Sequence, residues 1–196
     1  MLPVCCIGER HYNYSMTFQL EDTVRILRST PSVFRALFAN LPQEWLEARD
    51  SPQSFSAIEV LGHLIFGEQT DWIPRTKIIL ECGEARPFDP FDRRGFSGLI
   101  DGRSTADLLD MFGELREQSL SELESFKIGS SELALTGMHP GLGKVTLENL
   151  LAAWAVHDLG HTSQVARALA SQYRGAVGPW VAYMSILDPP KPAPPK

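Results

Sequence analysis

Cysteine is scarce in this chain and poorly placed for crosslinking. Three cysteines occur in 196 residues, namely Cys5, Cys6 and Cys82. An odd number that includes two neighbours does not build a disulfide framework, and without a Cys-x-x-Cys pair a thiolate metal site is not expected. We therefore expect reduced thiols, as is usual inside cells.

Excess basic charge and long apolar runs are also lacking. The formal net charge is −6, and the basic residues are scattered, whereas nucleic-acid-binding proteins cluster them to neutralise phosphates. No apolar stretch reaches the length of a membrane span, and the chain does not begin with a basic segment followed by an apolar run. These features predict a cytoplasmic protein that binds neither nucleic acid nor membranes.

Helical periodicity is the main positive signal. Apolar residues make up 43% of the chain, which is enough for the core of one domain. They recur at helical spacing, while strand-like alternation and hairpin turns are scarce. The pattern predicts an all-α fold, a four-helix bundle with a short additional C-terminal helix. We expect an irregular lead-in at 1–15, one helical domain at 16–187 and a disordered tail, rich in proline and lysine, at 188–196.

Local signals indicate where the helices begin and break. Ser56 and Ser104 are each followed three residues later by an acidic residue, the spacing of a capping box. Proline indicates a break at Pro31 and a bend at Pro74. The loop at 87–98 is interpreted as a surface crossover, with a cover over a site as the alternative. The expected helical segments are approximately 17–40, 56–80, one that starts at 104, 146–173 and 181–187.

Three of the five histidines lie in apolar helical segments. His157 and His161 are four residues apart, which places both side chains on one face of a helix, and His63 lies in a second helix. Buried imidazoles are costly unless a partner satisfies them, and neutral ring nitrogens are good metal ligands. We predict that the three histidines bind one divalent metal ion, zinc or nickel. The alternative is that they are core residues hydrogen-bonded to the backbone or to water.

Two other metal motifs do not fit these histidines. A zincin has Glu at the position of Asp158 and a further ligand downstream, but neither His nor Glu occurs after His161. A di-metal carboxylate bundle has Glu three residues before its histidines, and none of the three has it. A mononuclear site with three histidines and one open position remains.

Other polar residues lie near the histidines in the sequence. Gln164 is one turn after the last histidine and is interpreted as a residue that orients a ligand through a hydrogen bond. Glu68 is expected to form a salt bridge with Arg75 or Arg167. For Asp158 we expect a structural hydrogen bond to a neighbouring helix or loop. The sequence identifies no catalytic base and no residue that binds an organic cofactor.

Several segments resemble members of the DinB-like superfamily. The similar segments are 62–68 (GHLIFGE), 139–147 (HPGLGKVTL), 157–164 (HDLGHTSQ) and 177–180 (VGPW), and the resemblance extends over about 18–187. Members of that family are four-helix bundles in which one histidine of the second helix and a His-x-x-x-His pair of a later helix hold a metal ion. The resemblance implies these roles for His63, His157 and His161.

The resemblance also implies a class of function. It implies a metal-dependent enzyme that acts on a small molecule, either as a hydrolase or as an S-transferase that uses a low-molecular-weight thiol. The family takes its label from damage-inducible proteins, so a stress response is expected, and bundles of this kind can form homodimers. The alternative is a metal-binding stress-response or scaffold protein without catalytic activity.

Overall fold

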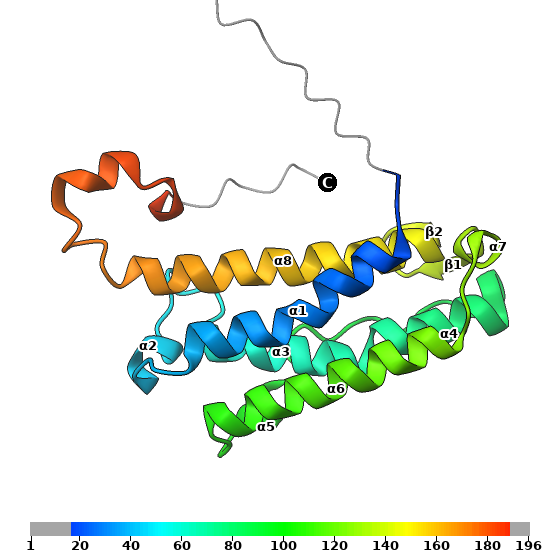
Figure 1. Ribbon diagram of the computed structural model, residues 1–196, viewed down its shortest axis with the longest axis horizontal. Coiled ribbons are helices and arrows are strands. Elements are labelled where there is room, and N and C mark those ends of the chain that lie inside the picture. Colours follow the sequence, from blue (N-terminus) through cyan, green and yellow to red (C-terminus); the bar gives the residue numbers. More distant parts are fainter. Residues whose placement is uncertain (1–16, 189–196) are drawn as a thin grey trace, which may run out of the picture.

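Four long helical segments make up the body of the protein. The computed structural model describes residues 17–188, and the predicted lead-in at 1–15 and the tail beyond Asp188 lie outside the described residues. The segments lie side by side (Figure 1) and are α1 (Leu20–Phe38), α3 (Ala57–Thr70) followed by α4 (Trp72–Cys82), α6 (Thr105–Ser125) and α8 (Leu147–Ser171). Because α1 and α3 each pack against both α6 and α8, the bundle is closed, and the predicted all-α four-helix bundle is confirmed.

Shorter elements connect the long helices and extend the last one. They are α2 (Gln43–Glu47), η1 (Gly83–Ala85), α5 (Ser97–Ile100), α7 (Ser130–Leu133), η2 (Gly178–Tyr183) and η3 (Ser185–Leu187), in which η marks a 3-10 helix. The predicted additional C-terminal helix is present as η2 and η3, which form a hook at the end of α8 (Figure 1). Leu187 is buried, and η3 contacts α8. Within residues 17–188, no helix is long and apolar enough to span a membrane.

Capping residues explain where the site-bearing helices begin. The Ser56 hydroxyl accepts from the main-chain N–H of Glu59, and the Glu59 carboxylate accepts from the N–H of Ser56. Ser104 forms the same reciprocal pair at the start of α6, so both predicted capping boxes are confirmed. Thr146 caps α8 by accepting from the N–H of Asn149. These bonds satisfy orphan donors of the first turn and so fix the starts of the helices.

The predicted break at Pro31 is wrong, because α1 runs through this residue. Proline has no N–H, so the carbonyl of Leu27, four residues earlier, loses its helical donor. In this fold the guanidinium of Arg116 replaces that donor, with Nη1 2.7 Å from the Leu27 oxygen. A helix tolerates an internal proline where a neighbouring side chain bonds the carbonyl that proline leaves free.

The predicted bend at Pro74 occurs three residues earlier, as a break between α3 and α4 at Asp71. A proline ring clashes with the carbonyl four residues before it, here that of Thr70, and it fits the first turn of a helix. The chain therefore ends α3 at Thr70 and starts α4 so that Pro74 lies in its first turn.

A short antiparallel hairpin precedes α8, in a part of the chain where no strand was predicted. Strand β1 (Thr136–His139) pairs with β2 (Gly143–Thr146) in register Thr136↔Thr146. Phe88 joins it by donating its N–H to the carbonyl of Met138 at 2.9 Å. At Gly137 a Cβ would lie 2.8 Å from Ile79, so only glycine allows this close approach of β1 to α4. Strands of four residues are too short to show a period-2 pattern in sequence.

The core has two apolar clusters with a charged side chain between them. One cluster includes Leu27, Leu151 and Trp154, and the other includes Phe34 and Phe112. Arg116 is fully buried, and its guanidinium lies over the rings of both Trp154 and Phe112, at 5.2 and 5.1 Å from their centroids. The interior of the bundle therefore contains a polar layer.

Candidate metal centre

The three predicted histidines converge in the bundle interior. His63 lies on α3, while His157 and His161 lie one turn apart on α8. The Nε2 atom of His157 is 3.2 Å from that of His63 and 3.1 Å from that of His161, and one ligand atom from each of the three lies within 4.8 Å of the others. Nitrogens bound at about 2.0–2.1 Å to one tetrahedral zinc ion are about 3.3 Å apart. The donor set therefore fits a single ion, although metal binding itself stays a prediction.

Burial keeps two of the histidines, His63 and His161, neutral. Burial, and then the rings of His161 and His157, lower the pKa of His63 to about 3. Burial and His157 lower the pKa of His161 to about 4, against the opposing effect of its hydrogen bond to Gln164. Both rings are neutral at pH 7, so each can offer a nitrogen lone pair. Neutral imidazole is the form that binds metal ions.

Gln164 fixes the orientation of His161. Its Oε1 lies 2.9 Å from Nδ1 of His161. An amide oxygen only accepts, so Nδ1 carries the proton and the Nε2 lone pair faces the other two histidines. This is the geometry expected for Gln164 from the sequence, and it is how outer residues commonly set the tautomer of a metal-binding histidine.

Aromatic side chains line the histidine cluster. The ring centroids of Phe91 and Phe55 lie 5.4 and 5.7 Å from that of His63, and the ring of Trp72 lies 5.2 Å from that of His157. Phe91 belongs to the 87–98 loop, so this loop both connects two helices and packs against the candidate metal site. The side chain of His157 remains 27% exposed, and the cluster is therefore not sealed from solvent.

A buried ion network lies beside the histidines. Arg116 on α6 contacts Glu68 on α3 at 2.8 Å and Asp158 on α8 at 2.7 Å. The prediction that Glu68 pairs with Arg75 or Arg167 is wrong. Glu68 pairs with Arg116, while Arg75 pairs with Asp71 at 2.6 Å. The structural hydrogen bond expected for Asp158 is confirmed.

Sequence reasoning missed Arg116. The residue lies four positions after Phe112, within the buried stripe of α6 that also contains Leu120 and Leu123. A charged residue on an apolar stripe is the signal that could have identified it, since arginine is almost never fully buried without a partner.

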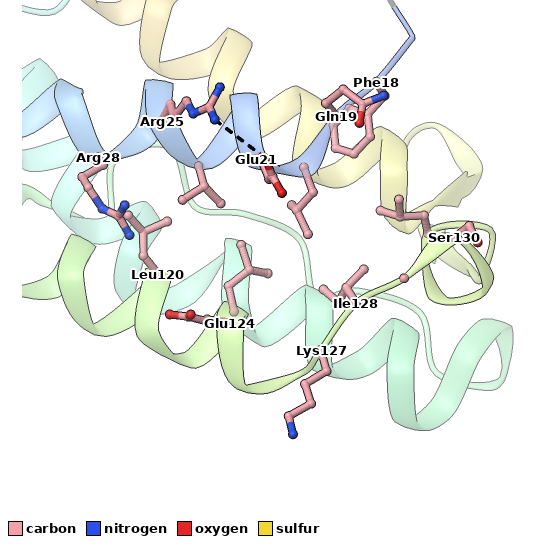
Figure 2. Close-up of a pocket in the computed structure, with 15 residues that line it drawn as sticks. Phe18, Gln19, Glu21, Arg25, Arg28, Leu120, Glu124, Lys127, Ile128 and Ser130 are labelled. Atoms are coloured by element: carbon pink, nitrogen blue, oxygen red, sulfur yellow. Dashed lines mark ion pairs between the residues drawn. The ribbon is translucent and has the colours of Figure 1, made fainter.

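A groove with apolar and charged side chains lies elsewhere on the bundle. It has a volume of about 780 Å³ and is formed by the start of α1, the end of α6 and the segment that leads into α7 (Figure 2). Its charged side chains include Glu21 and Arg25, which pair with each other at 3.7 Å (Figure 2). None of the three histidines lines this groove, so it is separate from the candidate metal centre.

Comparisons with solved structures agree with the fold. Two solved four-helix bundles are similar in structure. YfiT from Bacillus subtilis, described as a probable metal-dependent hydrolase with an unusual four-helix bundle topology, has a TM-score of 0.67 and 21% identity, over 86% of this chain and 95% of its own. TT2238, described as a four-helix bundle protein, has a TM-score of 0.52 and 17% identity, over 76% of this chain and 98% of its own. At these identities the similarity shows the fold alone.

The family assignment rests on the sequence itself. A search of the curated proteins found no significant match. The model of the DinB superfamily matches residues 26–165, which is more than half of the chain and includes His63, His157 and His161. The chain therefore belongs to the DinB superfamily.

Proposed function

We propose that the protein is a metal-dependent hydrolase that acts on a small molecule at the site of His63, His157 and His161. The observation that carries the proposal is the convergence of three ring nitrogens on one point, with spacings that match a single ion. Zinc and nickel are the metals that we expect. The description of YfiT as a probable metal-dependent hydrolase supports the same reaction class.

A bound ion would supply Lewis acidity and lower the pKa of a water molecule that it holds. The chain supplies the rest of the site. Gln164 holds the ring of His161, while Phe55, Phe91 and Trp72 surround the histidines with apolar rings that limit the access of water. Partial exposure of His157 leaves a route for a small substrate. An accessible site favours catalysis over the alternative of a non-catalytic metal-binding scaffold.

Transfer to a low-molecular-weight thiol is the alternative reaction at the same site. Both reactions would use the open position, and they differ in the nucleophile, which is water in one case and a thiolate in the other. A stress response, a cytoplasmic location and a homodimer stay predictions.

Metal content and turnover test the proposal together. Protein purified without chelators should contain about one zinc or nickel ion per chain, and His157→Ala should lose it. The metal-loaded protein is then assayed with a panel of esters and amides, and with electrophiles plus thiols. Hydrolysis that depends on His157 supports the proposal, thiol-dependent turnover supports the transferase instead, and metal binding without turnover supports the scaffold.

His139→Ala is the matched control for the loss of a histidine. His139 accepts at Nδ1 from the N–H groups of Gly141 and Leu142 in the hairpin turn, at 3.0 and 3.1 Å, and does not belong to the cluster. This variant should keep its metal ion. Equal metal loss in both variants, or a wild-type protein that binds no ion, would overturn the proposed function.

A further inference from the structure

Asp158 and His157 each have one buried polar atom without a hydrogen-bond partner among the described residues, and these two atoms face each other. Oδ1 of Asp158 lies 3.9 Å from Nδ1 of His157. Both atoms are buried, and neither has a hydrogen-bond partner within residues 17–188. A buried polar atom without a partner is costly. The remaining gap is about 1 Å longer than a normal hydrogen bond, so a small rotation of the imidazole would satisfy both atoms.

Asp158 is itself rigidly held. Its other oxygen, Oδ2, accepts from Nη1 of Arg116 at 2.7 Å, and the side chain is fully buried. Arg116 is held in turn by Glu68 through Nη2 and by the Leu27 carbonyl through Nη1. The carboxylate is therefore fixed by groups from α6, α3 and α1, and its free oxygen points to a ring on α8.

The charges of this network do not balance. One guanidinium, Arg116, lies between two carboxylates, Glu68 and Asp158, and all three side chains are at most 1% exposed. A surplus buried negative charge is unfavourable unless a cation lies nearby. The neighbouring group is the histidine cluster, where a divalent cation would compensate for this charge.

We propose that Asp158 is the positioning residue of His157, and that its Oδ1 accepts the Nδ1 proton of that ring when an ion occupies the site. This inference rests on the proposed metal site. The bond would leave the lone pair of Nε2 on the side of His63 and His161, and it would make the ring a stronger ligand. His161 already has such an arrangement with Gln164. Each of the two α8 ligands would then have its own outer partner.

Asp158→Asn removes the acceptor that the proposal requires. Because Arg116 presents a donor, the new amide must turn its oxygen to Arg116 and its NH₂ group to His157, where it meets a second donor. Outer carboxylates of metal-bound histidines contribute about 10–100-fold to metal affinity. We expect a zinc affinity about 10–100-fold below that of the wild-type protein, measured by competition with a chromogenic chelator.

Glu68→Gln is the matched control, because it removes one negative charge from the same network without touching His157. The amide oxygen can still accept from both Arg116 and Trp154, as Oε1 of Glu68 does. We expect a smaller loss of zinc affinity in this variant than in Asp158→Asn, because it lowers the charge of the network but leaves the acceptor of His157 in place. Equal weakening in both variants would show an effect of charge alone and overturn the positioning role, as would wild-type affinity in Asp158→Asn.

A spectroscopic measurement on the wild-type protein covers the case in which Asp158→Asn does not fold. In the zinc-loaded protein, ¹⁵N-labelled His157 should show a proton on Nδ1 that is protected from exchange with water. An unprotonated or freely exchanging Nδ1 would overturn the proposal. If the wild-type protein binds no zinc, the proposed metal site fails as well, whereas normal zinc binding with an unprotected Nδ1 removes only the role of Asp158.

Discussion

Arg116 donates through Nη1 to the carbonyl oxygen of Leu27 at 2.7 Å, the same oxygen that Pro31 deprives of its helical donor. One side chain thus completes the hydrogen bonding of α1 and pairs with carboxylates of α3 and α8. The long helices of the bundle are therefore linked at one buried point, immediately beside the histidine cluster.

Replacing Arg116 by methionine should destabilise the protein strongly. The change leaves Glu68 and Asp158 as unpaired buried charges and frees the carbonyl of Leu27, and breaking a buried pair in this way costs about 3–5 kcal/mol. Urea denaturation should show this loss. Arg25→Met is the control, because Arg25 is exposed and pairs only on the surface, where a change of less than about 1 kcal/mol is expected. Similar losses in the two variants would contradict the role of the network.

Pro31→Ala should reduce the effect of losing Arg116. Alanine restores an N–H that can donate to the Leu27 carbonyl, so this carbonyl no longer depends on the guanidinium. A double-mutant cycle of Pro31→Ala and Arg116→Met should give a coupling of about 1 kcal/mol, the value of one hydrogen bond. Strictly additive losses in the free energy of unfolding would show that Arg116 does not stabilise α1 through this carbonyl.

The histidines could be identified from sequence because their spacing is local information. His157 and His161 lie on one turn of one helix, and a capped helix preserves that relation in any fold. The fold class followed from periodicity in the same way. By contrast, the partner of Glu68 could not be identified, because it depends on how α3 and α6 are rotated about their axes. The continuity of α1 through Pro31 depends on the same long-range contact, which local proline rules do not include.

The stability of the metal-free protein should fall as the pH decreases from 7 to 5. The pKa of His63 is about 3 in the folded protein and about 6.5 in an unfolded chain. The unfolded state therefore binds more protons in this interval, so that the free energy of unfolding decreases with falling pH. This contribution is complete above about pH 6.5 and is lost progressively toward pH 3.

Urea titrations at pH 7 and pH 5, in the presence of chelator, measure this dependence. His63→Leu should show a smaller loss between the two pH values than the wild-type protein, because it lacks one of the depressed groups. The exposed carboxylates are the same in both proteins, so their contributions cancel in the comparison. An equal loss in the two proteins would show that His63 is not buried in its neutral form.

Gly95 should be required for the close packing of the 87–98 loop against the site. A Cβ at this position would lie 2.4 Å from the Phe66 ring, and the ring centroid of Phe66 lies 5.5 Å from that of Phe91, which contacts His63. Gly95→Ala must therefore displace an aromatic wall, and we expect it to cost about 1–3 kcal/mol in urea denaturation. Gly98→Ala is the matched control in the same segment, because a Cβ there meets no atom within 4 Å. Equal stability of Gly95→Ala and Gly98→Ala would show that the loop is not packed on Phe66 in solution. It would then contradict the placement of Phe91 against His63.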